Sequence, residues 1–475
     1  MRCQLEVLRD CLAPSVRKIL DELPKTLDET YERVLKEICN PNREHAHRLL
    51  QCLTVALRPL RVEELAEVLA IDFDAPTHGG IPESNPEWRW EDQRGALLSA
   101  CSSLIEIVHH GHSEVVQFSH FSVKEYLTSD RLALSSDVSF YHIPLEPAHA
   151  TLAQACLGVL LCLDDSVDRY NADHIPLVEY AAQYWFDHAG FEDVASRIRG
   201  AMEYFFDEDK PHWTAWLQVQ TIDGPWEWFE SDPTTDYSFP LYYASLGGFY
   251  DLAEHLAGKN PKHINAKGGR MVAPLVAALR GKHFRVAELL HRNGADVDVR
   301  DRYKDTPLRE ACRAGALDIL QWLLDHGADL NAQNYVGWTA LHGAINYGQP
   351  QAFHMLIARN PDIHIRTNLG KSPLHLAASP QVNRDHVDLM QVLLDCGADP
   401  NARDNDDSTP LHHSSWWEKE GYPLLKGTVE GTRLLLEHGA IIDAEDNKGR
   451  TPLQLAREHG RQDVMICLLQ YGATR

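Results

Sequence analysis

The chain contains residue types that carry out chemistry, but their spacing matches few reactive sites. The tripeptide Gly-Lys-Ser at 370–372 has the ending of a nucleotide-binding phosphate loop. Five positions before Gly370 stands Ile365, where that loop requires a glycine so that the backbone can approach the phosphate. The sequence has no GxSxG nucleophile elbow and no HExxH zinc motif, and its cysteine, histidine and carboxylate residues form no nucleophile set. The sequence therefore predicts a protein that is not an enzyme.

Three histidines, His109, His110 and His112, are the strongest candidates for metal ligands. They fall in the turn between two expected strands, where side chains point in different directions. No cysteine or carboxylate lies near them at zinc-ligand spacing, so we expect neither a metal nor another cofactor. The ten cysteines include no CxxC pair and mostly lie among apolar residues, which indicates reduced, buried thiols.

The elements that organise the chain are phrases of the Thr-Pro-Leu type in its C-terminal half. Most of the phrases recur at steps near 33 residues, and their Pro position falls at 240, 274, 307, 340 (an alanine), 373, 410 and 452. Thr or Ser before Pro caps a first helix, and Pro at the first helical position loses no hydrogen bond. An apolar stripe at helical spacing then predicts a second helix in each unit. Because one helix pair cannot bury its own apolar face, about seven pairs must stack over residues 237–475.

This period and this phrase resemble the ankyrin repeat, which implies a mainly α-helical solenoid. The resemblance implies that His342, His375 and His412, in the fourth position of the phrase, bind backbone between neighbouring repeats. It also implies that hairpin tips and exposed first-helix positions contact the partner. Our predicted partner-binding residues are Arg302, Tyr303, Asp305, Arg313, Tyr335, Val336, Trp338, Asn346, Tyr347, Trp416 and Trp417. Further tip positions are Leu369, Lys371, Asn405, Asp406, Lys448 and Arg450.

Three regions precede the repeats. Residues 1–45 include Leu-Pro-Lys-Thr-Leu-Asp-Glu-Thr-Tyr at 23–31 and resemble the end of the NACHT ATPase module of fungal NOD-like receptors. Residues 46–131, with strands expected at 103–109 and 114–119, resemble the winged-helix domain that follows this module. Residues 132–236 are rich in aromatic residues and are expected to form a helical spacer that covers the first repeat.

His120 lies in the stretch 117–127, which resembles the segment of NOD-like ATPases that presents a histidine to the phosphate of bound ADP. The resemblance implies a nucleotide-sensing role for His120. Because the chain has no phosphate loop of its own, such a role requires a NACHT ATPase in another polypeptide or in sequence missing from the N-terminus.

Composition and charge narrow the classes of partner. The formal net charge of −24 argues against nucleic acid, because phosphate binding relies on clustered Lys and Arg. The longest apolar run, near 152–163, is too short to cross a bilayer, and a signal peptide is missing, so we expect a cytoplasmic or nuclear protein. The expected function is a scaffold or regulator that binds a protein. One alternative is an adaptor that brings clients to a ubiquitin ligase or to a signalling or biosynthetic assembly. The other is an enzyme with an unrecognised site in residues 46–236.

Overall fold

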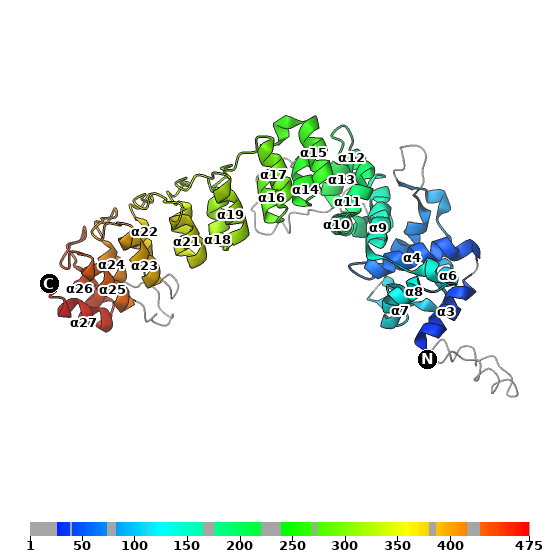
Figure 1. The fold of residues 1–475 in the computed structure, drawn as a ribbon, viewed down its shortest axis with the longest axis horizontal. Helices are drawn as coiled ribbons and strands as arrows, with labels where there is room; N and C mark the ends of the chain where they lie inside the picture. Colours follow the sequence, from blue (N-terminus) through cyan, green and yellow to red (C-terminus); the bar gives the residue numbers. More distant parts are fainter. Residues whose placement is uncertain are drawn as a thin grey trace. The chain divides into compact units, whose positions relative to one another are not determined.

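The structure, a computed structural model of the full chain, is mainly helical and divides into two compact units, Met1–Leu289 and Leu290–Arg475 (Figure 1). The residues that the structure describes are 26–38, 40–73, 82–111, 113–164, 175–219, 239–268, 273–379, 386–415 and 428–474.

The first unit begins with a small sheet packed against helices. Its strands, in spatial order, are β1 (Leu60–Arg61), β5 (Ser113–Phe118) and β4 (Ile105–His110). Both pairs are antiparallel, and Val116 of the central strand lies opposite both Leu60 and Ile107. The two strands expected at 103–109 and 114–119 are thus β4 and β5, joined by a tight turn at Gly111, where φ is 61°. The elements of this part are α3 (Leu27–Glu37), η1 (Asn40–Asn42), α4 (Arg43–Val55), β1 (Leu60–Arg61), α5 (Val62–Glu67), η2 (Val68–Ala70), β2 (Ile71–Asp72), β3 (Glu83–Ser84), η4 (Pro86–Trp88), α6 (Gln93–Cys101), η5 (Ser102–Leu104), β4 (Ile105–His110), β5 (Ser113–Phe118) and α7 (Phe121–Leu127).

The next part of the first unit is a helical segment with an aromatic core. The rings of Trp185 and Trp216 are fully buried with centroids 5.5 Å apart. The Trp216 ring also lies 5.6 Å from that of Tyr243, so this segment packs against the first repeated helix pair. The elements that follow α7 are α8 (Asp130–Ala133), η6 (Ser139–Tyr141), α9 (Leu145–Leu160), α10 (Val178–Ala189), α11 (Val194–Arg197), α12 (Arg199–Phe205) and α13 (His212–Val219).

Repeated helix pairs follow, and the first helix of each begins at the predicted position, from Pro240 to Pro452. The first two pairs are α14 (Pro240–Leu246) with α15 (Tyr250–Lys259), and α16 (Pro274–Arg280) with α17 (Phe284–Arg292), with η9 (Pro261–His263) between them; the boundary between the two units falls within α17. In the second unit they are α18 (Pro307–Ala314) with α19 (Leu317–Asp325), α20 (Ala340–Asn346) with α21 (Pro350–Ile357), α22 (Pro373–Ala378) with α23 (His386–Asp395), α24 (Pro410–Ser415) with α25 (Thr428–Glu437), and α26 (Pro452–Glu458) with α27 (Gln462–Gln470).

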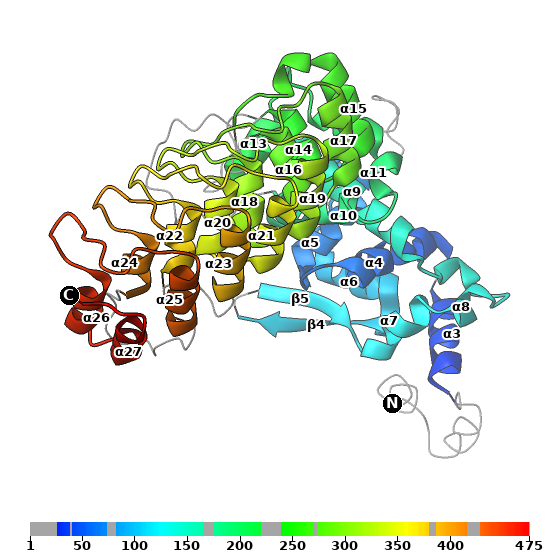
Figure 2. The same ribbon diagram turned by 60° about the vertical axis from the view of Figure 1, so that its left-hand side comes forward.

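The core of the second unit lies between successive helix pairs. Leu308 and Leu341 in the first helices and Leu323 and Leu393 in the second helices are at most 1% exposed. The hairpins that precede α18, α20, α22, α24 and α26 lie on one side of these helices (Figure 2). Stacking of helix pairs therefore presents one series of hairpins to solvent.

Candidate partner-binding surface

Each hairpin of the second unit ends in a five-residue turn, which we name after the helix pair that follows it. Tip 3 is residues 301–305, tip 4 is 334–338, tip 5 is 367–371, tip 6 is 404–408 and tip 7 is 446–450. The first residue of each turn accepts backbone hydrogen bonds through its side chain, which closes the turn. In tip 3, for example, Asp301 Oδ1 accepts from the N–H groups of Tyr303 at 2.8 Å and Asp305 at 2.7 Å.

A backbone ladder joins neighbouring tips. A single N–H of each tip donates to a carbonyl of the preceding one at 2.9–3.1 Å. The donor and acceptor pairs are Tyr335 to Tyr303, Asn368 to Val336, Asn405 to Leu369, and Asn447 to Asp406. Gly337 allows this close approach, because a Cβ at this residue would lie 2.6 Å from the Asn368 nitrogen. Since every rung is a backbone bond, the side chains on the tips are held in a fixed order.

Large apolar side chains project from three consecutive tips. Tyr303 is 45% exposed, Tyr335 57%, Val336 36% and Leu369 64%. The Tyr303 and Tyr335 rings are in contact, with centroids 6.0 Å apart, and the guanidinium carbon of Arg302 lies 4.7 Å from the centre of the Tyr303 ring. We call these five residues the tip edge. The structure thus places four of the predicted partner-binding residues on consecutive tips together with Leu369, one of the further tip positions.

Two other predicted tip residues have structural contacts. Asp305 accepts a bidentate pair from the Arg309 guanidinium, with both distances 2.5 Å, and a hydrogen bond from the Asn334 side-chain amide at 2.7 Å. Asp305 therefore connects tips 3 and 4. Trp338 is half-buried at the base of tip 4, where its N–H donates to the side chain of Asn334 at 2.9 Å. A substitution of Asp305 would therefore disturb the turns, whereas the Trp338 contact uses the backbone N–H and would survive replacement of its side chain.

The remaining predicted residues lie at the opposite end of the first helices. Arg313 is in the last turn of α18 and pairs with Glu310, with Nε 2.7 Å from the carboxylate, and this hydrogen bond raises the pKa of Arg313. Asn346 and Tyr347 end α20, and the Tyr347 ring is 45% exposed. The tips precede α18 and α20, whereas this group lies at the C-terminal ends of the same helices. The length of a helix therefore separates the group from the tip edge. Trp416 and Trp417 lie outside the described residues.

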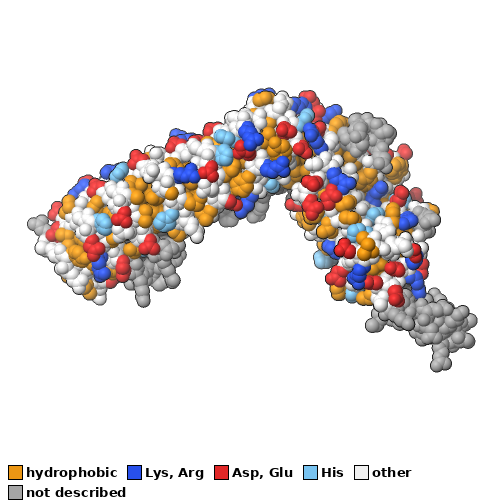
Figure 3. All heavy atoms as spheres, in the orientation of Figure 1, with side chains coloured by type: hydrophobic (Ala, Val, Ile, Leu, Met, Phe, Trp, Pro, Cys, Tyr) orange, Lys and Arg blue, Asp and Glu red, His pale blue; other side chains and the backbone are white. Residues whose placement is uncertain are grey.

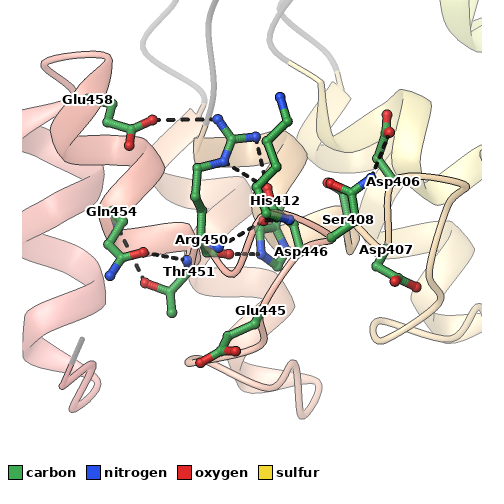
Figure 4. A network of polar contacts seen from close by, with 12 residues as sticks. Asp406, Asp407, Ser408, His412, Glu445, Asp446, Arg450, Thr451, Gln454 and Glu458 are labelled. Carbon is green, nitrogen blue, oxygen red and sulfur yellow. Dashed lines mark hydrogen bonds and ion pairs between the residues drawn. The ribbon is translucent and has the colours of Figure 1, made fainter.

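His375 and His412 of the repeated phrase connect neighbouring helix pairs, as the resemblance implied, whereas His342 bonds Thr339 of its own phrase through Nδ1 and its buried Nε2 has no hydrogen-bond partner among the described residues. Nδ1 of His412 accepts from the Thr409 N–H at 3.1 Å, and its Nε2 donates to the Arg450 carbonyl at 3.1 Å (Figure 4). His375 makes the same contacts with Ser372 and with the Ser408 carbonyl. Figure 4 also shows the Arg450 side chain held between Asp446 and Glu458. Hydrogen bonds from His375 and His412 therefore stabilise the last residues of tip 6 and tip 7, respectively.

Burial changes the acid–base behaviour of these histidines. It lowers the pKa of His342 to about 4 and the pKa of His375 to about 4, since neither imidazole can be solvated as a cation. For His375 the neighbouring His413 lowers the pKa further, while the hydrogen bond to Ser408 and the charge of Asp404 oppose the shift. Both side chains are therefore neutral at physiological pH.

His120, the predicted nucleotide sensor, is an exposed helix cap in this structure. Its Nδ1 accepts from the Ser122 N–H at 3.2 Å and caps α7. The Ser122 hydroxyl also lies 2.7 Å from the Tyr31 hydroxyl, which connects the cap to α3. Next to it, Phe121 is 71% exposed. These contacts give His120 a structural role, and nucleotide sensing stays a prediction.

Within the residues that the structure describes, there is neither a cluster of potential metal ligands nor a membrane-spanning helix. Within these residues, no three or more His, Cys, Asp or Glu side chains are grouped so that they could share a metal ion. His109 lies 3.5 Å from Glu114, and His112 is outside the described ranges. None of the helices in those ranges has the length and apolar character that a bilayer crossing requires.

Family comparisons agree with this architecture. A model for ankyrin repeats matches residues 241–334, 275–367 and 341–426, and a model described as the winged helix domain of GPI inositol-deacylase matches residues 31–140. The chain therefore carries ankyrin repeats behind an N-terminal winged helix domain, and the predicted fold class is confirmed. Ankyrin repeats are modules for protein–protein interaction.

Similar proteins cover only parts of the chain. Azaphilone pigments biosynthesis cluster protein L of Monascus ruber is 30% identical over 296 residues, which are 58% of this chain and 61% of that protein. Potassium channel AKT1 of Oryza sativa is 33% identical over 91 residues, which are 9% of the channel. The ankyrin repeat domain of Bcl-3, a solved structure, is 28% identical with a TM-score of 0.42, and the match covers 49% of this chain and 99% of that domain. The chain thus spans less than two thirds of the length of these two curated relatives.

Proposed function

We propose that this chain is a non-enzymatic scaffold or regulator that captures a protein partner on the tip edge. The observation that carries the proposal is the row of exposed Tyr303, Tyr335, Val336 and Leu369 on three consecutive tips. Tyrosine and arginine side chains dominate binding hot spots: tyrosine buries a large area with few rotatable bonds, and the planar arginine guanidinium stacks on rings and forms several hydrogen bonds. The ladder between tips holds them before the partner arrives, so less entropy is lost on binding.

Replacing Tyr303 and Tyr335 together by alanine is expected to weaken partner binding by roughly 30-fold or more, which corresponds to about 2 kcal/mol. The full chain, used as bait, would first identify partners by affinity capture and mass spectrometry. The affinity of the captured partner would then be measured by calorimetry with the wild type and the variant. Both tyrosines are half exposed, so the variant should keep the thermal midpoint of the wild type.

The matched control is Ile466→Ala with Leu469→Ala, which also removes two exposed apolar side chains. These residues are 57% and 52% exposed on α27, in the last helix pair and outside the tips. The control should bind as the wild type does. Undiminished binding by the tyrosine variant, or an equal loss in the control, would argue against the tip edge as the binding surface.

A narrower proposal is an adaptor within a biosynthetic assembly. The relative from Monascus ruber is named as a protein of an azaphilone pigment biosynthesis cluster, and it is the observation that favours this role. Captured partners that belong to one biosynthetic pathway would support the proposal. Capture of a NACHT ATPase would instead support a regulator of NOD-like receptors that acts in the cytoplasm.

The proposed regulation of a NACHT ATPase can be tested directly at His120. In His120→Ala the helix cap is lost, which should cost about 1 kcal/mol of stability. If His120 senses nucleotide in trans, the variant should also weaken the ADP-dependent association of the chain with the captured ATPase. Ser122→Ala removes the hydroxyl that contacts both Tyr31 and Nδ1 of His120, but it keeps the imidazole and the backbone N–H that His120 caps, so ADP dependence should persist. Equal ADP dependence in the His120 variant and the wild type would remove the sensing role.

A further inference from the structure

Two tryptophans of the first unit are exposed on the segment that joins β3 to α6. Trp88, the last residue of η4, is 48% exposed, and Trp90 is 49% exposed. The other tryptophans in the described ranges are buried or half-buried. Neither exposed indole contacts an aromatic ring or a cation within those ranges. Two large ring surfaces therefore stand side by side in the sequence without a partner from the described chain.

The residue between the two tryptophans anchors the segment. Arg89 is extended, with φ −67° and ψ 133°, and its guanidinium makes two hydrogen bonds of 2.8 Å to the fully buried carboxylate of Glu67. Because side chains alternate in direction along an extended backbone, the tryptophans on either side of Arg89 project away from Glu67. The Asn85 N–H also donates to the Ala70 carbonyl at 2.8 Å, which fixes the start of the segment. The two indoles are therefore oriented before any partner binds.

The charges that flank the tryptophans are negative. Glu87 directly precedes Trp88, Glu91 directly follows Trp90, and both glutamates are exposed. Neither carboxylate has an ion-pair partner among the described residues. A third acid, Asp92, is used within the chain, because its Oδ1 accepts the Gly95 N–H at 2.8 Å at the start of α6. Glu87 and Glu91 are therefore the two carboxylates left to act on a ligand.

The basic side chains of this segment are already paired. Arg89 is bound to its buried carboxylate, and Arg94 of α6 is hydrogen-bonded to Glu114 of β5. The sequence contains no lysine between Lys36 and Lys124. The two arginines therefore do not neutralise the glutamates beside the tryptophans.

Exposed indoles beside unpaired carboxylates favour a cationic ligand. Over the face of the molecule shown in Figure 3, acidic and basic side chains are intermixed, and such mixtures give little net attraction. An indole face attracts a guanidinium or an ammonium group more strongly than the rings of tyrosine and phenylalanine do. The carboxylates strengthen this attraction, whereas they repel the anionic lipids of a membrane surface. The formal net charge of −24 also favours the approach of a basic partner.

We propose that Trp88 and Trp90, with Glu87 and Glu91, form a second binding surface, which takes a basic segment of a protein partner. We call these four residues the tryptophan surface. Positions 88 and 90 are two residues apart, about 7 Å in an extended chain. Arginines two positions apart in an extended partner segment therefore match the two rings. This surface lies in the winged helix domain, so it goes beyond the proposed function of the tip edge and gives the scaffold a second site.

Labelled peptides added to the full chain test the proposal by fluorescence anisotropy. One peptide alternates arginine with glycine, and in two others glutamine or glutamate replaces every arginine. The arginine peptide should bind the wild type, roughly tenfold or more tighter than the glutamine peptide, and the glutamate peptide should bind least. The preference for arginine should fall as salt is added.

Substitutions on the tryptophan surface then separate the contribution of the rings from that of the charges. Trp88→Ala with Trp90→Ala should weaken binding of the arginine peptide by roughly tenfold, and phenylalanine at both positions should restore part of the loss. Glu87→Gln with Glu91→Gln should weaken it by about threefold at low salt and by less at high salt. All four side chains are exposed, so each variant should keep the thermal midpoint of the wild type.

Two matched controls should keep the wild-type affinity for the arginine peptide. Phe121→Ala with Leu134→Ala removes two apolar side chains of the first unit that are 71% and 87% exposed. Asp388→Asn with Glu430→Gln changes the net charge by the same amount as the glutamate variant, at exposed positions of the second unit.

Each outcome supports or overturns the proposal. If the tryptophan variant binds the arginine peptide as tightly as the wild type does, net charge alone attracts the peptide and the proposal is wrong. It is also wrong if the wild type ignores the peptide, or if it binds phosphatidylcholine vesicles instead and loses them in the tryptophan variant, since the rings would then contact lipid. Tyr303→Ala with Tyr335→Ala should leave peptide binding unchanged. Loss of the peptide in that variant would place the peptide on the tip edge, which overturns this inference and leaves the proposed function standing.

Discussion

Lowering the pH from about 7.5 to about 5 is expected to reduce the free energy of unfolding of the second unit by about 4 kcal/mol. His342 and His375 are buried, and burial lowers the pKa of each to about 4. Their unfolded pKa is about 6.5, so the unfolded chain binds protons that the folded unit excludes. The stability from these neutral side chains is therefore present above about pH 6.5 and is lost as the pH falls toward 4. Amide hydrogen exchange of residues 339–412 would measure the loss locally.

The control for this prediction is His375→Gln. The chain uses glutamine in the same position of its last repeated phrase, where Gln454 accepts the Thr451 N–H at 3.0 Å. Glutamine does not titrate, so this variant should lose only about 2 kcal/mol over the same pH range. A pH dependence equal to that of the wild type would show that His375 is not held neutral in the folded unit.

Arg309→Met is expected to destabilise the second unit by about 3 kcal/mol or more. The aliphatic stem is preserved, but the carboxylate of Asp305 loses its bidentate partner while its side chain is only 15% exposed. Asn334 donates to the same carboxylate at 2.7 Å, so movement of Asp305 would disturb tip 4 through this hydrogen bond. Chemical unfolding of the full chain, with hydrogen exchange at tips 3 and 4, would measure the effect.

Neutralising both partners provides the comparison. The double variant Asp305→Asn with Arg309→Met has no unpaired buried charge. The new amide at position 305 can still accept the hydrogen bond from the Asn334 side chain. It should therefore recover much of the stability lost in Arg309→Met. If the double variant is as unstable as the single one, the loss arises from packing beside Gly343, whose added Cβ would lie 3.5 Å from Arg309 Cγ, and the ion pair contributes little.

The repeated helices were predicted closely from the sequence, because their signals are local. Every first helix begins at the predicted Pro position or its alanine equivalent, and Thr306 caps α18 as expected. These boundaries depend on a cap, on the fixed φ of proline and on an apolar stripe, all of which lie within a few residues. The two strands around Gly111 were likewise predicted from signals that lie close together in the chain. The role of the phrase histidines required the resemblance to ankyrin repeats, since their backbone partners lie a full repeat away, as Arg450 does for His412.

The candidate surface could be predicted only in outline. Tyr303, Asp305, Tyr335 and Trp338 all occupy tip positions, and composition gives no reason to separate them. Their environments differ because neighbouring tips approach each other. Arg309 stands where three other phrases carry histidine, and its longer side chain reaches Asp305. These contacts pair Asp305 with Arg309 and Asn334. They also leave Trp338 half-buried.

The sequence by itself determined that this protein is a stack of ankyrin repeats behind a winged helix domain, because period, caps and apolar stripes are properties of the local chain. Tertiary structure alone decided which tip side chains face solvent and which of them contact one another. Those contacts depend on backbone bonds between tips that are about one repeat apart, such as the one from Tyr335 to Tyr303. Contacts between distant residues of this kind form only when the helix pairs pack together.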